Sequence, residues 1–355
     1  MNEKEQKLQT YHSLSNMHRF RLRLFAEGIL TGVFAGLVIS FFRFALVEAE
    51  ALRGALYNRL WVSSWSINAC WFAVLVALAF ILHKLNIFEP MAAGSGIPQV
   101  KGTILGLMKM RWLRVLYVKL SAGILGIGAG LSLGREGPSI QLGAVAAQGI
   151  SRLLGRTRME ERYLLTSGAS AGLAAAFNAP LAGVIFALEE LHRNFSIMVL
   201  LPSMAAAFTA TIISRAIFGR ATIFDIPDLQ LLPLSYYGIV VLVALAAGAF
   251  GVLFNWGLLN IGRFYSLPLF QKPVHKIIFA LLCAGVLGYF LPEVLGGGNE
   301  LINQLAKAPV SLQLLLVFLA GKLLFTLISY GCGVPGGFFL PMLVIGALCG
   351  SICAQ

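Results

Sequence analysis

An arginine and a glutamate stand side by side inside an apolar, glycine-rich stretch, in the sequence GREGP at residues 134–138. Charged side chains are expensive in membrane segments, so Arg135 and Glu136 need a functional reason. Pro138 suits the first turn of a helix, which puts Glu136 and Gly137 at a helix N-terminus whose free amides attract anions. Burial favours protonated Glu136, whereas Arg135 and the helix N-terminus favour its ionised form. These residue types therefore predict an anion site beside a carboxyl group that exchanges protons.

A second stretch, GGFFLP at residues 336–341, has the same layout without a charged side chain. If Pro341 starts a helix in the same way, Phe338 and Phe339 present free backbone N–H groups at its N-terminus. Two broken helices that point at one place form an anion site without a full positive charge. An ion bound in this way can also leave, as conduction requires.

These two stretches belong to an internal repeat. Residues 119–144 reappear without a gap as residues 322–347, an offset of 203 positions. Eight pairs of residues are identical: Lys119/Lys322, Leu120/Leu323, Gly128/Gly331, Gly130/Gly333, Gly134/Gly337, Pro138/Pro341, Gly143/Gly346 and Ala144/Ala347. Repeats whose matching hydrophobic segments are broken by Gly and Pro indicate a transporter's binding site at the repeat interface. Close helix packing through small residues is the alternative explanation of the glycines.

A third motif, GSGIP at residues 94–98, places a hydroxyl donor before another proline-started helix. Alone, this motif is typical of an ordinary loop and helix start. Together with GREGP and GGFFLP, it extends the predicted anion site to Ser95, Gly96 and Ile97.

The three motifs, in this order, resemble the anion-site signatures of the CLC family of chloride channels and proton/chloride antiporters, and the resemblance covers residues 20–355. It implies an all-α integral membrane protein, a CLC-type multi-helix bundle with an inverted internal repeat and broken helices. It also implies a bound chloride ion as the only cofactor, and a homodimer with one pathway per subunit. Ser95, with its hydroxyl, would bind the central anion, and Glu136 would be the gating glutamate. Since nitrate-accumulating relatives carry proline in place of this serine, the intact motif favours chloride.

The apolar run at residues 179–188 ends in Glu189 and Glu190. Taken alone, this pair is typical of a solvated helix end. The resemblance, however, matches Glu190 to the glutamate that passes protons between cytoplasm and pore in antiporters. Gln99 and Lys101 differ from the acids that some antiporters carry, and this changes the charge near the proton pathway. A passive chloride channel on the same fold therefore remains an alternative to antiport.

The composition also indicates a multi-pass protein of the cell membrane, since 58% of the residues are hydrophobic and 12% are charged. Several apolar stretches reach the roughly 20 residues that a spanning helix needs, and none alternates with the period of a barrel strand. The net charge of +12 lies in short connections rather than in a basic domain, so we expect no nucleic-acid partner. The basic N-terminal segment is predicted to be cytoplasmic, and the cluster from Arg152 to Arg162 is a weaker cytoplasmic candidate.

The repeat predicts how the chain is organised. We expect a cytoplasmic N-terminal segment at 1–24, a first membrane repeat at 25–193, a connecting helix at 194–229 and an incomplete second repeat at 230–355. Nothing in the second repeat matches residues 168–190 of the first. We therefore expect the chain to be part of a longer protein, and the family's last coordinating tyrosine to lie beyond Gln355.

One motif suggests a different function. Residues 168–172 match G-x-S-x-G and, with His192 downstream, could belong to an intramembrane serine protease. Good helix formers continue straight through this motif, however, which favours close helix packing over a strained nucleophile turn. The histidines also lack metal-ligand spacing, so we expect neither an enzyme nor a metal site.

Overall fold

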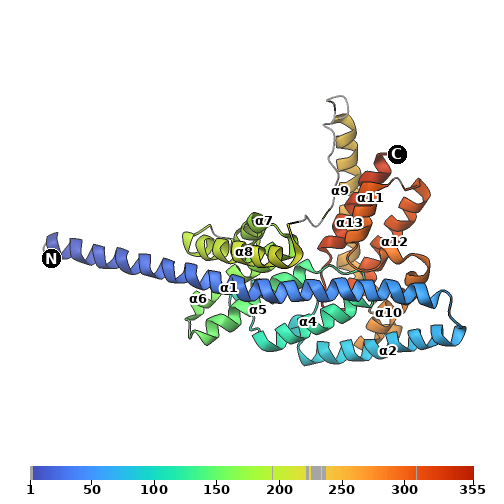
Figure 1. The fold of residues 1–355 in the computed structure, drawn as a ribbon, viewed down its shortest axis with the longest axis horizontal. Helices are drawn as coiled ribbons and strands as arrows, with labels where there is room; N and C mark the ends of the chain where they lie inside the picture. The colour runs from blue at the N-terminus through green and yellow to red at the C-terminus, as the bar shows by residue number, and fades with distance from the viewer. Residues whose placement is uncertain (1–2, 194, 221–223, 225–232, 234–236, 309) are drawn as a thin grey trace. The chain divides into compact units, whose positions relative to one another are not determined.

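The computed structural model describes residues 3–193, 195–220, 224, 233, 237–308 and 310–355 (Figure 1). In the first part of the chain the helices are α1 (Glu3–Leu60), α2 (Trp65–Phe88), η1 (Pro90–Ala92), α3 (Ile97–Ile104), α4 (Trp112–Gly128), α5 (Glu136–Leu153), α6 (Arg158–Phe177), α7 (Pro180–Phe186), the π-helical turn η2 (Ala187–His192) and α8 (Ile197–Phe218). They are followed by α9 (Tyr237–Phe264), η4 (Pro268–Phe270), α10 (Pro273–Phe290), η5 (Pro292–Val294), α11 (Asn299–Lys307), α12 (Leu312–Gly331) and α13 (Phe339–Cys353). Within these residues the predicted all-α architecture is confirmed.

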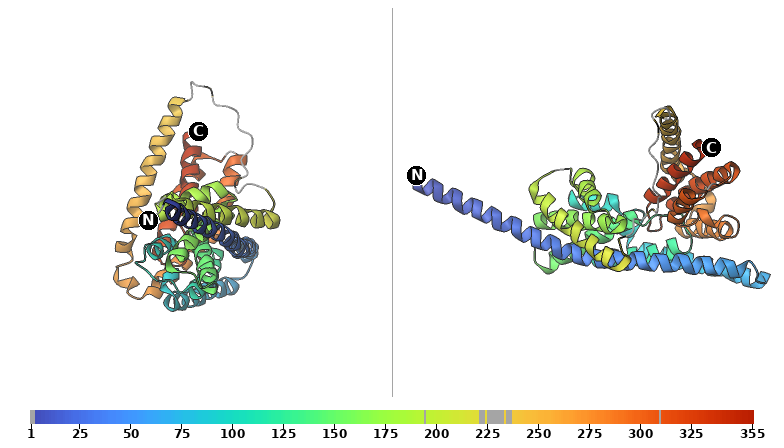
Figure 2. Two further views of the ribbon diagram at one scale, coloured as in Figure 1. Left: turned by 90° about the vertical axis from the view of Figure 1, so that its left-hand side faces the viewer. Right: turned by 45° about the horizontal axis from the view of Figure 1, so that its top comes forward.

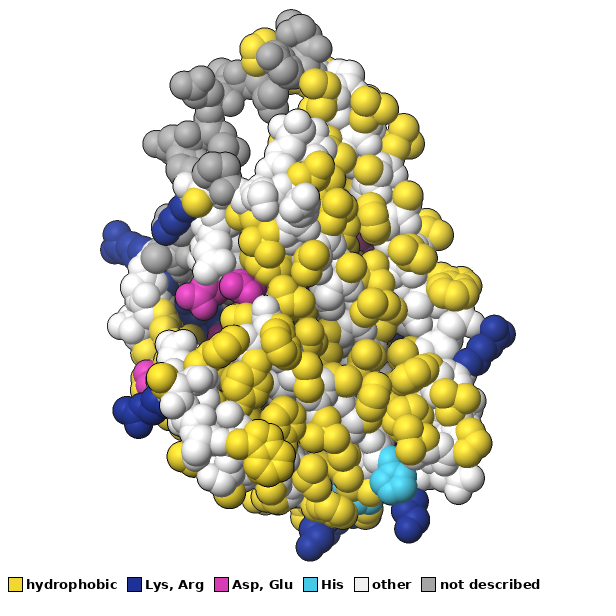
Figure 3. Space-filling view, turned by 90° about the vertical axis from the view of Figure 1, so that its right-hand side faces the viewer, with side chains coloured by type: hydrophobic (Ala, Val, Ile, Leu, Met, Phe, Trp, Pro, Cys, Tyr) yellow, Lys and Arg dark blue, Asp and Glu magenta, His cyan; other side chains and the backbone are white. Residues whose placement is uncertain are grey.

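Six of these helices are long and apolar enough to cross a membrane: α1 from Met17, α2, α8, α9, α10 and α12. The side chains of α9 illustrate the surface that results, since Val252, Trp256 and Leu259 are 72%, 63% and 78% exposed. Hydrophobic side chains also predominate on the face shown in Figure 3. Such a surface suits contact with lipid hydrocarbon rather than with water.

The internal repeat is present in the backbone. Helix α4 ends at Gly128 and α12 at Gly331, while α5 begins at Glu136 and α13 at Phe339, so both pairs keep the offset of 203. The shorter elements before them follow the same order, because η1 and α3 correspond to η5 and α11. The glycines therefore mark equivalent breaks between helices and do more than allow close packing.

The chain forms two compact units. The first unit comprises residues 1–41, 97–116 and 139–220, and the second comprises residues 42–96, 117–138 and 221–355. The predicted connecting region, 194–229, contains α8, and its residues 194, 221–223 and 225–229 lie outside the described residues.

Small residues bring helix backbones together in the first unit. Helix α6 packs against α7 and α8, and α1 runs as one continuous helix (Figure 2). A Cβ atom built on Gly28 of α1 would lie 2.6 Å from the carbonyl oxygen of Pro202 in α8, and one on Gly32 would lie 2.5 Å from that of Ala206. This spacing of four residues is the close-contact pattern of membrane helices.

Candidate functional site

The N-termini of α5 and α13 are tied together in the second unit. The backbone N–H of Gly134 donates to the carbonyl of Gly337, and the N–H of Gly337 donates to the carbonyl of Gly134, with N···O distances of 2.6 and 2.8 Å. Both helices begin two residues later, at Glu136 and Phe339, as the motifs predict. The first amides of two helices, which have no carbonyl partner within their own helix, are therefore held at one place.

The GSGIP loop joins the same place. Gly336 donates its N–H to the carbonyl of Gly94 at 3.0 Å. A Cβ atom on Gly137 would lie 2.8 Å from the Cβ of Ser95 and 2.9 Å from its carbonyl oxygen, so only glycine fits here without displacing the loop. Gly96 has a φ of +90°, a conformation that glycine adopts readily, and α3 starts at the next residue, Ile97. GREGP, GGFFLP and the first three residues of GSGIP therefore meet in the second unit.

The carboxyl group of Glu136 lies at the N-terminus of α13. Its side chain is buried, with Glu136 only 3% exposed, and it accepts hydrogen bonds from its own backbone amide and from that of Leu340. The other oxygen, Oε2, has no hydrogen-bond partner in the described part of the chain. A carboxylate in this position uses an amide that would otherwise be free to bind an anion.

Ser95 is also buried, and its side chain forms a hydrogen bond with Tyr330 of α12. The ring of Tyr330 in turn packs edge-on against Phe338, with ring centroids 5.0 Å apart. Phe338 is the N-cap residue of α13, whereas the side chain of Phe339 is exposed. The sequence motifs did not identify Tyr330 or Leu340 as parts of this site. Position 330 corresponds to an isoleucine in the first repeat, so the repeat gave no signal for a tyrosine there.

Two buried lysines support the loops around the site. Lys119 Nζ donates to the carbonyls of Ala92 and Gly94 at 2.9 and 2.7 Å. Lys322 Nζ binds the matching loop of the second repeat in the same way, at 2.9 Å from Val294 O and 2.8 Å from Gly296 O. Neither lysine is exposed. The signal for this role was available in the sequence, because two identical lysines lie at equivalent positions in apolar helices.

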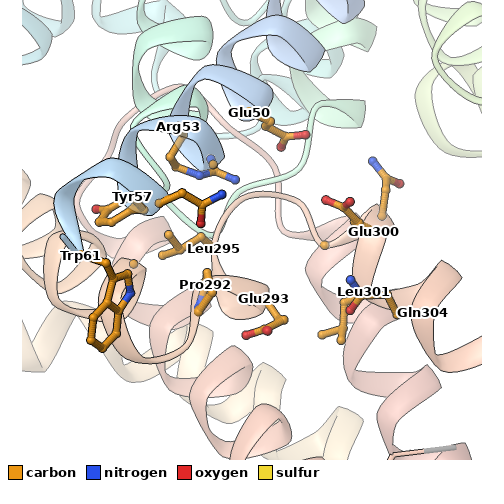
Figure 4. Close-up of a pocket in the computed structure, with 15 residues that line it drawn as sticks. Glu50, Arg53, Tyr57, Trp61, Pro292, Glu293, Leu295, Glu300, Leu301 and Gln304 are labelled. Carbon is orange, nitrogen blue, oxygen red and sulfur yellow. The ribbon is translucent and has the colours of Figure 1, made fainter. Parts of the chain in front are cut away.

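A separate cavity of about 460 Å³ lies in the second unit (Figure 4). Three carboxylates line it, those of Glu50, Glu293 and Glu300. Arg53, which also lines it, donates through Nη1 to the carbonyl of Gly128 at 3.2 Å and so caps the end of α4. The acidic lining does not suit an anion, so the three helix N-termini remain the candidate anion site.

Glu190 lies in the first unit, at the end of the apolar run, on the π-helical turn η2. Its Oε1 lies 2.6 Å from Nζ of Lys101 on α3, and the two side chains are 48% and 25% exposed. The hydrogen bond from Lys101 lowers the pKa of Glu190 below its ordinary value. The structure thus joins the candidate proton-transfer residue to the lysine that distinguishes this sequence from some antiporters.

The geometry of the G-x-S-x-G segment does not fit a protease. Ser170 is buried within the continuous helix α6 and donates to the carbonyl of Ser203 at 3.5 Å. Nδ1 of His192 pairs instead with the hydroxyl of Thr166, at 3.2 Å. The serine and the histidine therefore do not form the hydrogen-bonded pair that nucleophilic catalysis requires.

Comparisons with known proteins agree with the motifs. The model of the voltage gated chloride channel family matches residues 74–355. An H(+)/Cl(-) exchange transporter ClcA of Vibrio cholerae is 34% identical over 336 residues, which cover 91% of this chain and 70% of the relative. The corresponding transporter of Vibrio vulnificus is 36% identical, with 90% and 70% covered.

Solved structures agree as well. A slow cyanobacterial Cl-/H+ antiporter superposes with a TM-score of 0.81 at 32% identity, covering 91% of this chain and 77% of that one. A CLC-type fluoride/proton antiporter gives a TM-score of 0.75 at 26% identity, with 93% and 80% covered. The chain is therefore a multi-pass membrane protein with the CLC fold. It belongs to the CLC family, which is a family of transport proteins and not of enzymes.

Proposed function

We propose that this protein moves chloride across the membrane in exchange for protons, with Glu136 as its gate. The observation that carries the proposal is the buried carboxyl group of Glu136 against the backbone amide of Leu340, at the start of α13. Further support comes from the relatives, which are named as H(+)/Cl(-) exchange transporters, and from the similar cyanobacterial Cl-/H+ antiporter.

The gating step follows from competition for one positive potential. An ionised Glu136 and a chloride ion both favour the N-terminal amides of α5 and α13, so they exclude one another. Protonation removes the negative charge of Glu136 and lets the anion take its place. The unpartnered Oε2 gives the carboxyl group an atom that can carry this proton without breaking an existing hydrogen bond. Chloride binding and proton uptake are thereby coupled at one residue.

The remaining groups of the anion site act as donors. Ser95 supplies its hydroxyl, and the backbone amides of Gly96, Ile97, Gly137, Phe338 and Phe339 complete the set. Donors of this kind hold the anion without a neighbouring full charge, which allows it to leave again. The family resemblance supports a homodimer in which each subunit has its own pathway.

Glu190 is the proposed proton-transfer residue on the way to Glu136. It carries an ionisable group on an exposed helical turn, and its retention favours antiport over passive conduction. The ion pair with Lys101 supports the second candidate function, a passive chloride channel. A carboxylate that is held ionised takes up protons less readily, and chloride could then pass without them.

Two substitutions test the glutamate assignments in proteoliposomes that contain the purified protein. Glu136→Gln should keep chloride flux and lose coupled proton movement, because a neutral amide cannot exchange a proton. Glu190→Gln should also stop proton movement while chloride still passes, and its neighbour Glu189→Gln, a matched loss of one exposed acid, should leave both fluxes intact. Proton-coupled flux that survives Glu136→Gln would show that the gate is a different residue.

A further inference from the structure

A cavity of about 340 Å³ lies in the first unit, where the end of α5 and the start of α6 meet the connection from α3 to α4. Four basic side chains line it: Lys109, Arg152, Arg158 and Arg162. The only acidic residue in its lining is Glu161. The cavity therefore has an excess of positive charge and favours an anionic occupant.

The carboxylate of Glu161 already interacts with Gln148 and Arg152. Its Oε1 accepts a hydrogen bond from Nε2 of Gln148 at 2.7 Å and lies 3.8 Å from Nη2 of Arg152. In the described part of the chain, Lys109, Arg158 and Arg162 form no ion pair. Three cations in this cavity are thus left for a ligand.

Other basic residues of the same region do form ion pairs. Arg156 lies 2.5 Å from Oε1 of Glu27, and Arg23 pairs with Glu160. These pairs join α1 to the connection between α5 and α6 and to the first turn of α6, so they serve the packing of the first unit. The basic cluster read from the sequence therefore contains both structural ion pairs and a separate group of cations that face the cavity.

Gln148 provides a second, independent sign of a ligand. It is only 2% exposed and lines the cavity, yet its Oε1 has no hydrogen-bond partner in the described residues. A buried carbonyl oxygen without a donor is unfavourable, so a ligand group that donates a hydrogen bond would complete the site. The Arg162 guanidinium packs closely against the backbone of Gly106, because a Cβ atom on Gly106 would lie 2.6 Å from Nη2 of Arg162.

The surroundings of the cavity indicate where the ligand comes from. Apolar side chains at the end of α5, the start of α6 and the connection from α3 to α4 are strongly exposed: Leu107 by 79%, Leu153 by 81%, Met159 by 63% and Leu105 by 57%. Exposed leucines beside arginines are typical of a segment at the boundary between acyl chains and headgroups. A soluble anion would leave these apolar side chains exposed to water, whereas the acyl chains of a phospholipid would cover them.

We propose that this cavity binds the phosphate of an anionic phospholipid headgroup, with Arg158 and Arg162 as its principal cationic contacts. Basic pockets between membrane helices bind anionic headgroups by this chemistry. The phosphate pairs with the guanidinium groups, and a headgroup hydroxyl donates to Gln148. The positive-inside rule assigns an arginine-rich connection to the cytoplasmic leaflet, so the lipid would come from that side.

The test compares the affinities of three probes for the purified protein in neutral detergent: phosphatidylglycerol, phosphatidylcholine and inorganic phosphate. Phosphatidylglycerol combines a negative phosphate with hydroxyl donors, whereas phosphatidylcholine has the phosphate without net charge. We expect phosphatidylglycerol to bind best and the double variant Arg158→Gln/Arg162→Gln to weaken its binding by about tenfold. The double variant Arg220→Gln/Arg263→Gln, which removes two exposed arginines that do not line the cavity, should bind as the unmodified protein does.

Three results would overturn the proposal. If both double variants lose affinity for phosphatidylglycerol equally, the effect is one of overall charge. If neither loses affinity, the lipid binds at a different place. Inorganic phosphate that binds as tightly as phosphatidylglycerol would identify a soluble anion as the ligand. If the cavity variant has a lowered thermal midpoint in phosphatidylcholine, the single variants Arg158→Gln and Arg162→Gln are measured instead, each with an expected loss of about threefold.

Discussion

Gly134 and Gly337 occupy the same position in the two copies of the repeat, and each donates its backbone N–H to the carbonyl of the other. A reciprocal pair of equivalent residues is what a two-fold relation between the repeats produces. Through this pair the starts of α5 and α13 lie side by side, one with a carboxyl group and one without. The same contact therefore brings together the parts of the proposed anion site and leaves it with Glu136 as the single proposed gate.

The close approach of Gly137 to the GSGIP loop can be tested by Gly137→Ala. The added Cβ would lie 2.9 Å from the carbonyl oxygen of Ser95, so loop and helix must separate. Overpacking of this kind typically costs about 1–3 kcal/mol, and we expect chloride affinity to fall by about tenfold or more in isothermal titration. Gly346→Ala is the matched control, because no described atom beyond its chain neighbours and the nearby backbone of its own helix lies within 4 Å of a Cβ at that position. Equal chloride affinity in both variants would contradict the predicted geometry.

The two buried lysines should contribute equally to stability. Lys119→Met and Lys322→Met each remove the donor for two loop carbonyls, and a buried group left unsatisfied costs about 1–3 kcal/mol. We expect each variant to lower the thermal midpoint of the purified protein by several degrees. An unchanged midpoint in either variant would show that water or other groups replace the lysine, and that its loop role is dispensable.

The pH dependence of transport should respond to Lys101. The pKa of Glu190 lies below its ordinary value of 4.5 because Lys101 donates to the ionised carboxylate, so this group binds a proton only at low pH. In Lys101→Met the pKa of Glu190 returns toward 4.5, and the pH profile of proton flux should shift to higher pH. The ion pair between Lys101 and Glu190 contributes its full stabilisation when the pH is above the ordinary pKa of a glutamate. This contribution is lost as the pH falls through the lowered pKa of Glu190. Since both side chains are partly exposed, that contribution stays below about 1 kcal/mol.

Lys272→Met serves as the control for this experiment, since it removes an exposed lysine from the start of α10. Its pH profile should match that of the unmodified protein. If Lys101→Met leaves the profile in place, Glu190 does not limit proton entry.

Anion preference should depend on Ser95. Its hydroxyl is a donor that favours the smaller, more strongly hydrated chloride. Nitrate spreads its charge over three oxygens, so its binding weakens less when this donor is removed. Ser95→Pro should therefore raise the ratio of nitrate to chloride flux, and Ser95→Ala, which removes the hydroxyl without adding a ring, should shift it in the same direction. Identical ratios in all three proteins would remove Ser95 from the selectivity groups.

Much of the site could be predicted from sequence because its chemistry is local. The starts of α5 and α13 follow from GREGP and GGFFLP, since proline and glycine mark helix boundaries directly. The contacts that complete the site come from elsewhere in the chain. Tyr330 reaches Ser95, and Leu340 presents its amide to Glu136, through packing that no local pattern encodes. The ion pair of Lys101 with Glu190 likewise joins residues that are remote in sequence.

Coupling between chloride and protons is measured directly on the unmodified protein in proteoliposomes under an imposed chloride gradient. If Glu136 couples the two ions, chloride moving down its gradient should drive protons uphill, and the external pH should change in the direction that exchange requires. If chloride equilibrates and no protons move, Glu136 does not couple the two ions, and the protein is a passive channel on the same fold.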